Sequence, residues 1–206
     1  MSIAVEAVLQ LSDFGLLPGR LRRIAYDSGG FWPGLLRSGW RPNYPAQPWT
    51  MFVTYGFLHG GASHLIVNML TLWSLGVGVI ERVGARGLLL LYLAALLGGG
   101  LGFGLLAATL QPMVGASGAL FGLVGGLLAW AYVDRFTARL GLWPVARAVG
   151  FLVVLNLVLW WVMDGQLAWE THLGGFVTGW IAALLIDPRA RAADAPPHSD
   201  REAAGP

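Results

Sequence analysis

Long apolar runs separated by short polar breaks dominate the chain from residue 63 onward. Five runs approach or exceed the length of a membrane-spanning helix, which needs roughly 20 apolar residues. They cover residues 63–80, 87–110, 116–133, 145–163 and 168–186. A sixth run, 3–17, is shorter and carries Glu6 and Asp13, so it predicts a first span that is truncated or partly interfacial. The pattern predicts an all-α polytopic membrane protein with six transmembrane helices, the first one short.

The segments between these runs differ in length and character. Residues 18–58 are rich in proline, tryptophan and tyrosine, which favours a loop lying in the membrane interface over a spanning helix. Residues 81–86 predict a short loop between the second and third spans. The tail, 189–206, is rich in alanine, proline and charge and is expected to be disordered. The chain thus divides into a short first helix plus an interfacial outer loop (1–58), a membrane core (59–188) and a cytoplasmic tail (189–206).

Composition supports a lipid environment. Of 206 residues, 56% are hydrophobic and 12% are charged, and a soluble domain of this size could not bury so much apolar surface. All 13 basic residues are arginines scattered among polar breaks, so the chain has no electrostatic footprint for nucleic acid. Cysteine is absent, which excludes disulfides, thiolate metal sites and cysteine nucleophiles.

The distribution of arginine favours one orientation. With the N-terminus inside, the cytoplasmic segments carry eight arginines, and the long outer loop, 18–58, carries five. The outer breaks after the third and fifth spans carry none. Because basic residues concentrate on the cytoplasmic side, the N-in topology is favoured. If the first run does not insert, the N-terminus lies outside and the other spans keep their orientation.

Ser117 is the first of four polar side chains that stand out in the apolar runs, where such residues are functional candidates. It lies in the sequence GASG at 115–118, where the fourth span begins. The first turn of a helix has free backbone N–H groups, so a serine there can attack a carbonyl while those groups hold the oxyanion. Gly115 leaves room for a substrate backbone. The alternative is an N-cap serine with small neighbours for helix packing.

His172 begins the last span and lies on nearly the same helix face as Gly175 and Gly179. Glycines at this spacing allow another helix to approach closely. If that helix is the glycine-rich fourth span, His172 reaches Ser117 and can act as its general base. The alternative is a histidine that only forms a hydrogen bond between helices.

His64 and Asn68 are four residues apart and share a face of the second span. They can donate hydrogen bonds to an oxyanion, or they can hold helices together. Zinc is disfavoured because no third and fourth ligand lies at metal spacing, so no metal and no cofactor is expected. Glu170 is about 200° around the helix from His172, which predicts a helix-start carboxylate and not a third catalytic residue.

Together, four segments resemble the rhomboid family of intramembrane serine proteases. The sequence HGGASHLIVNM at 59–69 resembles the family's His-x-x-x-Asn segment, and LGVGVIERVG at 75–84 resembles the Gly–Glu–Gly pattern that follows it. GASGA at 115–119 resembles the Gly-x-Ser-Gly nucleophile motif, and HLGGFVTG at 172–179 resembles His-x-x-Gly-x-x-x-Gly. The order and spacing are similar to a six-helix bacterial rhomboid core.

The resemblance implies a serine endopeptidase in the bacterial inner membrane that cleaves single-pass transmembrane proteins within the lipid bilayer. It implies Ser117 as nucleophile, His172 as base, and an oxyanion hole formed by His64, Asn68 and the Ser117 backbone N–H. It also implies a water-filled cavity that opens to the outer side. The chain departs from the family at Trp49, which threonine follows in place of arginine, and at Val67, where an aromatic residue is common.

Two other functions are compatible with a membrane bundle of this kind. A non-proteolytic rhomboid-like protein would bind membrane clients without cutting them, but such relatives usually lack the serine or the histidine. A small-molecule transporter predicts internal repeats, which the sequence does not show.

Overall fold

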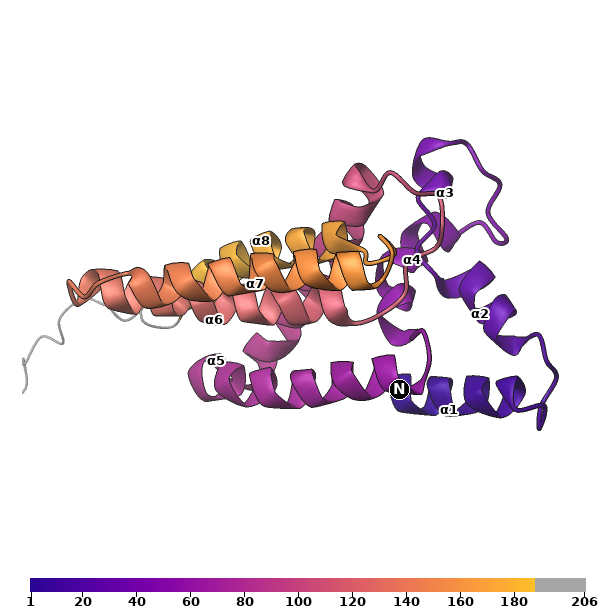
Figure 1. The fold of residues 1–206 in the computed structure, drawn as a ribbon, viewed down its shortest axis with the longest axis horizontal. Helices are drawn as coiled ribbons and strands as arrows, with labels where there is room; N and C mark the ends of the chain where they lie inside the picture. Colours follow the sequence, from indigo (N-terminus) through magenta and orange to yellow (C-terminus); the bar gives the residue numbers. More distant parts are fainter. Residues whose placement is uncertain (188–206) are drawn as a thin grey trace, which may run out of the picture.

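The computed structural model describes residues 1–187, which form a helical bundle with a cap of short helices at one end (Figure 1). The expected disorder of 189–206 falls outside the described residues. Within 1–187 the helices are α1 (Ser2–Asp13), α2 (Leu21–Gly29), α3 (Gly34–Arg37), α4 (Gln47–Thr54), the 3₁₀ turn η1 (Tyr55–Phe57), α5 (Ala62–Leu106), α6 (Ser117–Thr137), α7 (Trp143–Val162) and α8 (Trp169–Ile186). The predicted all-α membrane fold is confirmed.

Helices α5 to α8 contain the five long apolar runs. By length and composition alone, α5, α6 and α7 are able to cross a membrane. Helix α8 is 18 residues long, and its glycine-bearing face is buried. The observed ends differ from the predicted ones by a few residues: α5 stops at Leu106, four residues early, and α6 continues to Thr137, four residues late.

The loop predicted at 81–86 is wrong, because a single residue makes the break. Gly84 has φ 72° and ψ 177°, and helix continues on both sides of it. Only glycine adopts such a backbone conformation at little cost. Residues 62–83 and 85–106 therefore form two helical halves of about 33 Å each at 1.5 Å per residue. They point in different directions from the kink (Figure 1).

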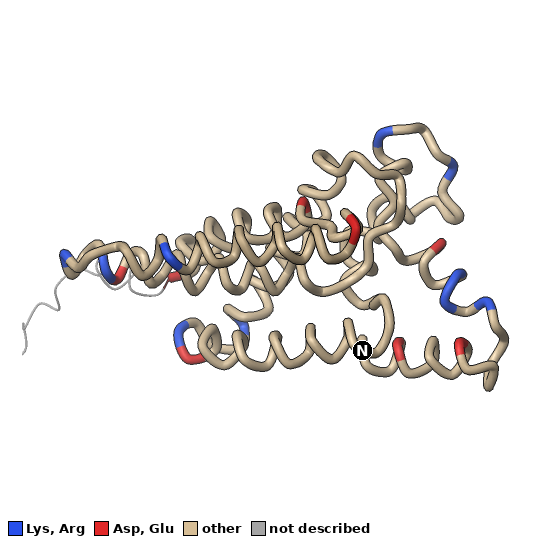
Figure 2. The backbone as a smooth tube through the Cα atoms, viewed as in Figure 1, with Lys and Arg blue, Asp and Glu red and all other residues tan. Residues whose placement is uncertain are grey.

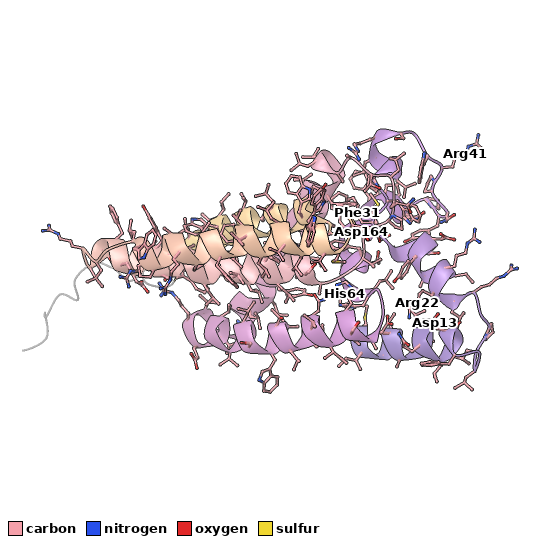
Figure 3. All side chains as sticks on the ribbon, in the orientation of Figure 1. Asp13, Arg22, Phe31, Arg41, His64 and Asp164 are labelled. Carbon is pink, nitrogen blue, oxygen red and sulfur yellow. The ribbon has the colours of Figure 1, made fainter. Side chains whose placement is uncertain are left out.

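The first helix is short, as its sequence predicts. Twelve residues make α1 about 18 Å long, well below the ~30 Å hydrocarbon core of a bilayer. It continues the line of the first half of α5 on the far side of the N-terminus (Figure 1). Arg22 of α2 ties it in place through ion pairs with Glu6 at 2.7 Å and Asp13 at 2.6 Å (Figure 3).

The segment 18–58 is folded, whereas an interfacial loop was expected from its prolines. Pro48 lies at the start of α4, a position where a missing N–H costs nothing, so it begins a helix and does not break one. Phe31, Met51 and Tyr55 are fully buried against α5. Their burial anchors this cap to the bundle, beside the start of α6.

Charged residues gather at the two ends of the molecule, and the middle of the bundle is largely free of them (Figure 2). At the end away from the cap, Arg82 forms ion pairs with Asp134 and Asp187 at 2.6 Å and 2.8 Å. Between the two ends, large apolar side chains such as Trp73 and Phe151 are exposed. This arrangement is that of an integral membrane protein, whose apolar belt faces lipid.

Candidate active site

Glycines bring the backbones of α6 and α8 into direct contact. A methyl group on Gly175 would collide with the carbonyl of Gly118, and one on Gly179 would collide with the carbonyl of Gly122. The helix that packs on the His172 face is therefore the fourth span, which is the condition under which His172 reaches Ser117. Gly118 also lies close to Thr171, so the first turn of α6 packs against the first turn of α8. We call these four glycines the glycine seam.

The seam places Ser117 and His172 within hydrogen-bonding distance, with Oγ and Nε2 2.9 Å apart. The imidazole is nearly parallel to the Phe121 ring, with centroids 4.1 Å apart, and His172 is only 5% exposed. Ala116 occupies the N-cap position of α6, and Ser117 makes no capping bond. The N-cap alternative for Ser117 is therefore wrong, since its hydroxyl faces the histidine.

Gly115 and His64 lie close to each other beside Ser117. Gly115 has φ +127°, and its N–H donates to the Tyr55 carbonyl at 3.0 Å. A Cβ at Gly115 would lie 2.8 Å from His64 Cε1 and 3.1 Å from Nε2, so the imidazole edge faces this glycine. The Gly60 N–H donates to His64 Nδ1 at 3.1 Å. In the neutral imidazole, Nε2 then carries the proton, which makes it a donor directed toward the space beside Ser117.

Asn68 is buried, and the hydrogen bond that its side chain donates stays within its own helix, α5. Its Nδ2 donates to the His64 carbonyl at 2.8 Å, and its Oδ1 has no partner among the described residues. The structure thus gives no hydrogen bond from Asn68 to Ser117 or to another helix. Its role as an oxyanion donor stays a prediction.

Asn156 of α7 is the residue that sequence reasoning missed. His172 Nδ1 and Asn156 Oδ1 are 2.6 Å apart, on the side of the ring away from Ser117. Both ring nitrogens are therefore engaged, and Glu170, in the first turn of α8, is not a third member. The signal was an asparagine inside the apolar run 145–163, where a polar side chain is costly.

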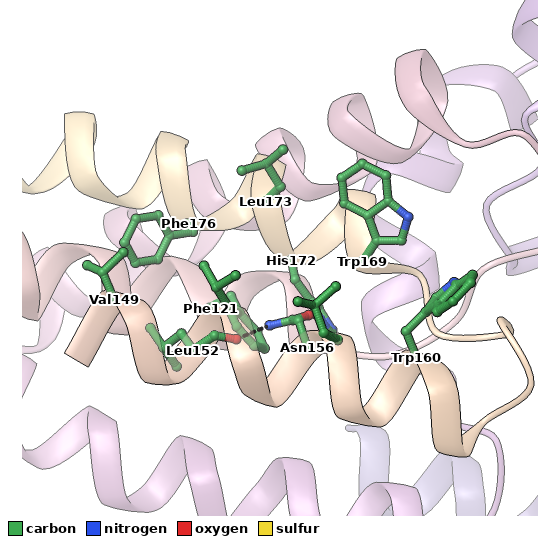
Figure 4. A pocket seen from close by; sticks show the side chains of 11 residues that line it. Phe121, Val149, Leu152, Asn156, Trp160, Trp169, His172, Leu173 and Phe176 are labelled. Atoms are coloured by element: carbon green, nitrogen blue, oxygen red, sulfur yellow. Dashed lines mark hydrogen bonds between the residues drawn. The ribbon is translucent and has the colours of Figure 1, made fainter. Parts of the chain in front are cut away.

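His172 and Asn156 line a groove of about 510 Å³ between α6, α7 and α8 (Figure 4). Its other walls are aromatic and aliphatic and include Trp160, Trp169 and Phe176. Helix α7 packs less closely against the bundle than α5 and α6 do. Of its 18-residue apolar stretch, 6% is buried, against 50% of the corresponding stretches of α5 and α6. No cluster of metal-ligating side chains occurs within residues 1–187.

The rhomboid domain model matches residues 45–189, which is most of the chain and includes every residue of this site. The chain belongs to the rhomboid family. The match begins within the cap, so α1, α2 and α3 lie outside it. The predicted family is confirmed.

Several relatives support this membership. The chain is 32% identical to "Rhomboid protease GluP" of Bacillus subtilis over 138 residues, covering 67% of this chain and 26% of that protein. It is 37% identical to "RHOMBOID-like protein 4" of Arabidopsis thaliana over 134 residues, 64% of this chain and 33% of that protein. The yeast "Rhomboid protein 1, mitochondrial" is 34% identical over 135 residues, 60% of this chain and 38% of that protein. The chain thus spans about a quarter to two fifths of these relatives.

Proposed function

We propose that this rhomboid is a serine endopeptidase that cleaves transmembrane segments of other proteins, in the inner membrane of a bacterium. The observation that carries the proposal is the 2.9 Å contact between Ser117 Oγ and His172 Nε2 at the start of α6. A serine beside a histidine at this distance is the arrangement of an activated nucleophile. The His64 edge and the free N–H groups of the first turn of α6 supply donors on the adjoining side.

In this reaction His172 Nε2 accepts the hydroxyl proton as Ser117 Oγ attacks the scissile carbonyl carbon. The carbonyl oxygen becomes an oxyanion, which the His64 Nε2–H and the Ser117 backbone N–H stabilise. His172 then transfers its proton to the departing amide nitrogen, and the C–N bond breaks. Water, deprotonated by the same His172, hydrolyses the acyl-enzyme and restores the serine.

The substrate we propose is a single-pass membrane protein. A peptide bond in a helix is shielded by its hydrogen bonds, so the segment must unwind before it is cut. Unwinding in lipid leaves backbone groups unsatisfied at several kcal/mol each, and helix-weakening glycine or proline lowers that cost. Ser117 begins α6 at the capped end, so the cut falls near the outer end of the client's helix. The close approach of His64 to Gly115 favours a small residue, such as alanine, at the cleaved position.

The decisive experiment compares the purified wild type with Ser117→Ala in detergent against a model single-pass substrate. The proposal requires cleavage by the wild type and none above background in Ser117→Ala or His172→Ala. Circular dichroism must show the same helix content, because a methyl group fits the space of the hydroxymethyl. Equal cleavage by Ser117→Ala refutes the proposed nucleophile. A wild type that binds the client without cutting it supports the alternative, a non-proteolytic rhomboid-like binding protein.

Substrate preference is tested by scanning the residue at the cleavage site and mapping the products by mass spectrometry. We expect cutting after alanine, beside glycine or proline, near the outer end of the client's helix. Equal cutting after alanine, phenylalanine and aspartate, or cuts at the cytoplasmic end, would contradict the proposed mode of binding while leaving the nucleophile in place.

A further inference from the structure

A chain of three hydrogen bonds links α7 to the proposed nucleophile. Asn156 Nδ2 donates to the Leu152 carbonyl at 2.9 Å, Asn156 Oδ1 meets His172 Nδ1 at 2.6 Å, and His172 Nε2 meets Ser117 Oγ at 2.9 Å. Figure 4 shows Asn156 and His172 next to each other in the groove, on α7 and α8 respectively. We infer that Asn156 is a positioning residue that holds His172 in the tautomer able to accept the proton of Ser117.

The direction of each bond follows from its first link. The Leu152 carbonyl can only accept, so the atom of Asn156 that faces it must be the NH₂ group. The other end of the amide, Oδ1, is then an acceptor, and His172 Nδ1 must carry the proton that it accepts. A neutral imidazole protonated at Nδ1 has its lone pair on Nε2. Ser117 Oγ–H is therefore the donor in the last bond, which is the state that a general base requires.

The position of Asn156 makes this orientation depend on α7. The rest of the site lies on α5, α6, α8 and the residues just before α6, and the glycine seam fixes α6 against α8. Helix α7 has one buried residue, Val145, near the end opposite the site. Asn156 therefore joins the base to the least tightly held helix of the bundle. When α7 moves away from α8, His172 loses the acceptor that selects its tautomer, so docking of α7 and readiness of the base are linked.

The inference rests on the proposed protease function, and three variants test it. Asn156→Leu keeps the size of the side chain and removes the acceptor. Asn156→Asp keeps an oxygen at the same place whether the carboxyl is ionised or neutral. Val158→Ala is the matched control, since Val158 is exposed on another face of α7 and does not line the groove. Initial rates with a model substrate, the Tm in detergent and labelling by a fluorophosphonate, which reacts with activated serines, are measured for each.

We expect Asn156→Leu to lower kcat about 10- to 100-fold while KM and Tm stay close to the wild-type values. The loss is smaller than the ~10⁴-fold observed in serine proteases where a substitution imposes the wrong tautomer, because here the ring only loses its preference. Fluorophosphonate labelling should slow by the same factor. Asn156→Asp should recover most of the rate, and Val158→Ala should match the wild type. A purely structural asparagine would change Tm and leave the labelling rate of the folded fraction unchanged.

Two results overturn the inference: wild-type kcat in Asn156→Leu, or equal losses in Asn156→Leu and Asn156→Asp. If Asn156→Leu does not fold, Asn156→Ala provides the same comparison. Failure of the proposed function gives a different pattern. In that case the wild type neither cleaves substrate nor labels at Ser117, and no Asn156 variant differs from it in either measurement.

Discussion

Gly115→Ala tests whether the space beside Ser117 depends on the approach of the His64 ring. The added methyl would lie 2.8 Å from His64 Cε1, whereas ordinary contacts begin near 3.4 Å, so the ring must retreat by about 0.6 Å. It would also place an L-residue at φ +127°. The substitution thus has two separable effects: backbone strain, which lowers stability, and displacement of the proposed oxyanion donor, which lowers turnover.

The backbone strain and the displacement of the donor each have an expected magnitude. Strain at such a backbone conformation costs about 1–3 kcal/mol, and each kcal/mol lowers Tm by roughly 2–4 °C for a protein of this size. Removal of one oxyanion donor costs on the order of 100- to 1000-fold in kcat. Because the donor moves and is not deleted, we expect Gly115→Ala to lower kcat by about 10- to 100-fold.

Gly61→Ala separates the two effects. Gly61 has a similar φ of +117°, but the nearest atom to its added methyl is 3.9 Å away, so the strain occurs without the clash. Tm should decrease by a similar amount in both variants, and kcat should decrease strongly only in Gly115→Ala. In a His64→Ala background the added cost of Gly115→Ala on kcat should largely disappear, because the ring that it displaces is gone. Equal kcat values for Gly115→Ala and Gly61→Ala in the wild-type background would refute the reasoning.

Two further predictions follow from buried side chains near the site. Asn68→Ala should lower kcat on the order of 100-fold with little change in Tm if its amide serves the oxyanion; a lower Tm with unchanged kcat would show that it only stabilises the first turns of α5. Burial and the neighbouring His64 lower the pKa of His59 to about 4, so the unfolded chain binds a proton that the folded chain does not between about pH 6.5 and pH 4. Stability should therefore be full above pH 6.5 and fall by up to ~1.4 kcal/mol per pH unit toward pH 4, and thermal unfolding of His59→Gln should lack this fall.

Sequence patterns predicted the spans and marked Ser117 and His172 as a possible pair, because each signal was local, whereas the resemblance to the family was needed to place His64 beside them. Apolar length marks a membrane helix, and glycines four residues apart mark a face that another helix can approach. The fourth span was one possible partner of that face, because it is rich in glycine and begins at Ser117. The pair of Ser117 and His172 depends on one contact between helices, α6 with α8, whereas His64 lies on a third helix, α5.

What the sequence did not reveal depends on tertiary context. The break at Gly84 is one residue long because a glycine conformation replaces a loop, and the residue type alone does not say which glycine adopts it. The sequence around Glu6 and Asp13 does not show that Arg22, from another helix, forms ion pairs with both. Asn156 was missed because its contact with His172 depends on which side of α7 faces α8, and the apolar run around it shows no preferred face.

The glycine seam has a consequence for the entropy of assembling the site. Glycine usually weakens helices in water because its backbone loses much freedom on folding. In a bilayer the helices form before they associate, so that loss precedes the docking of α6 against α8. Docking through Gly118, Gly122, Gly175 and Gly179 then immobilises no side-chain rotamers. The distance between the α6 and α8 backbones is thus set by main-chain contact, with no rotamer changes in the seam to broaden it as the temperature rises.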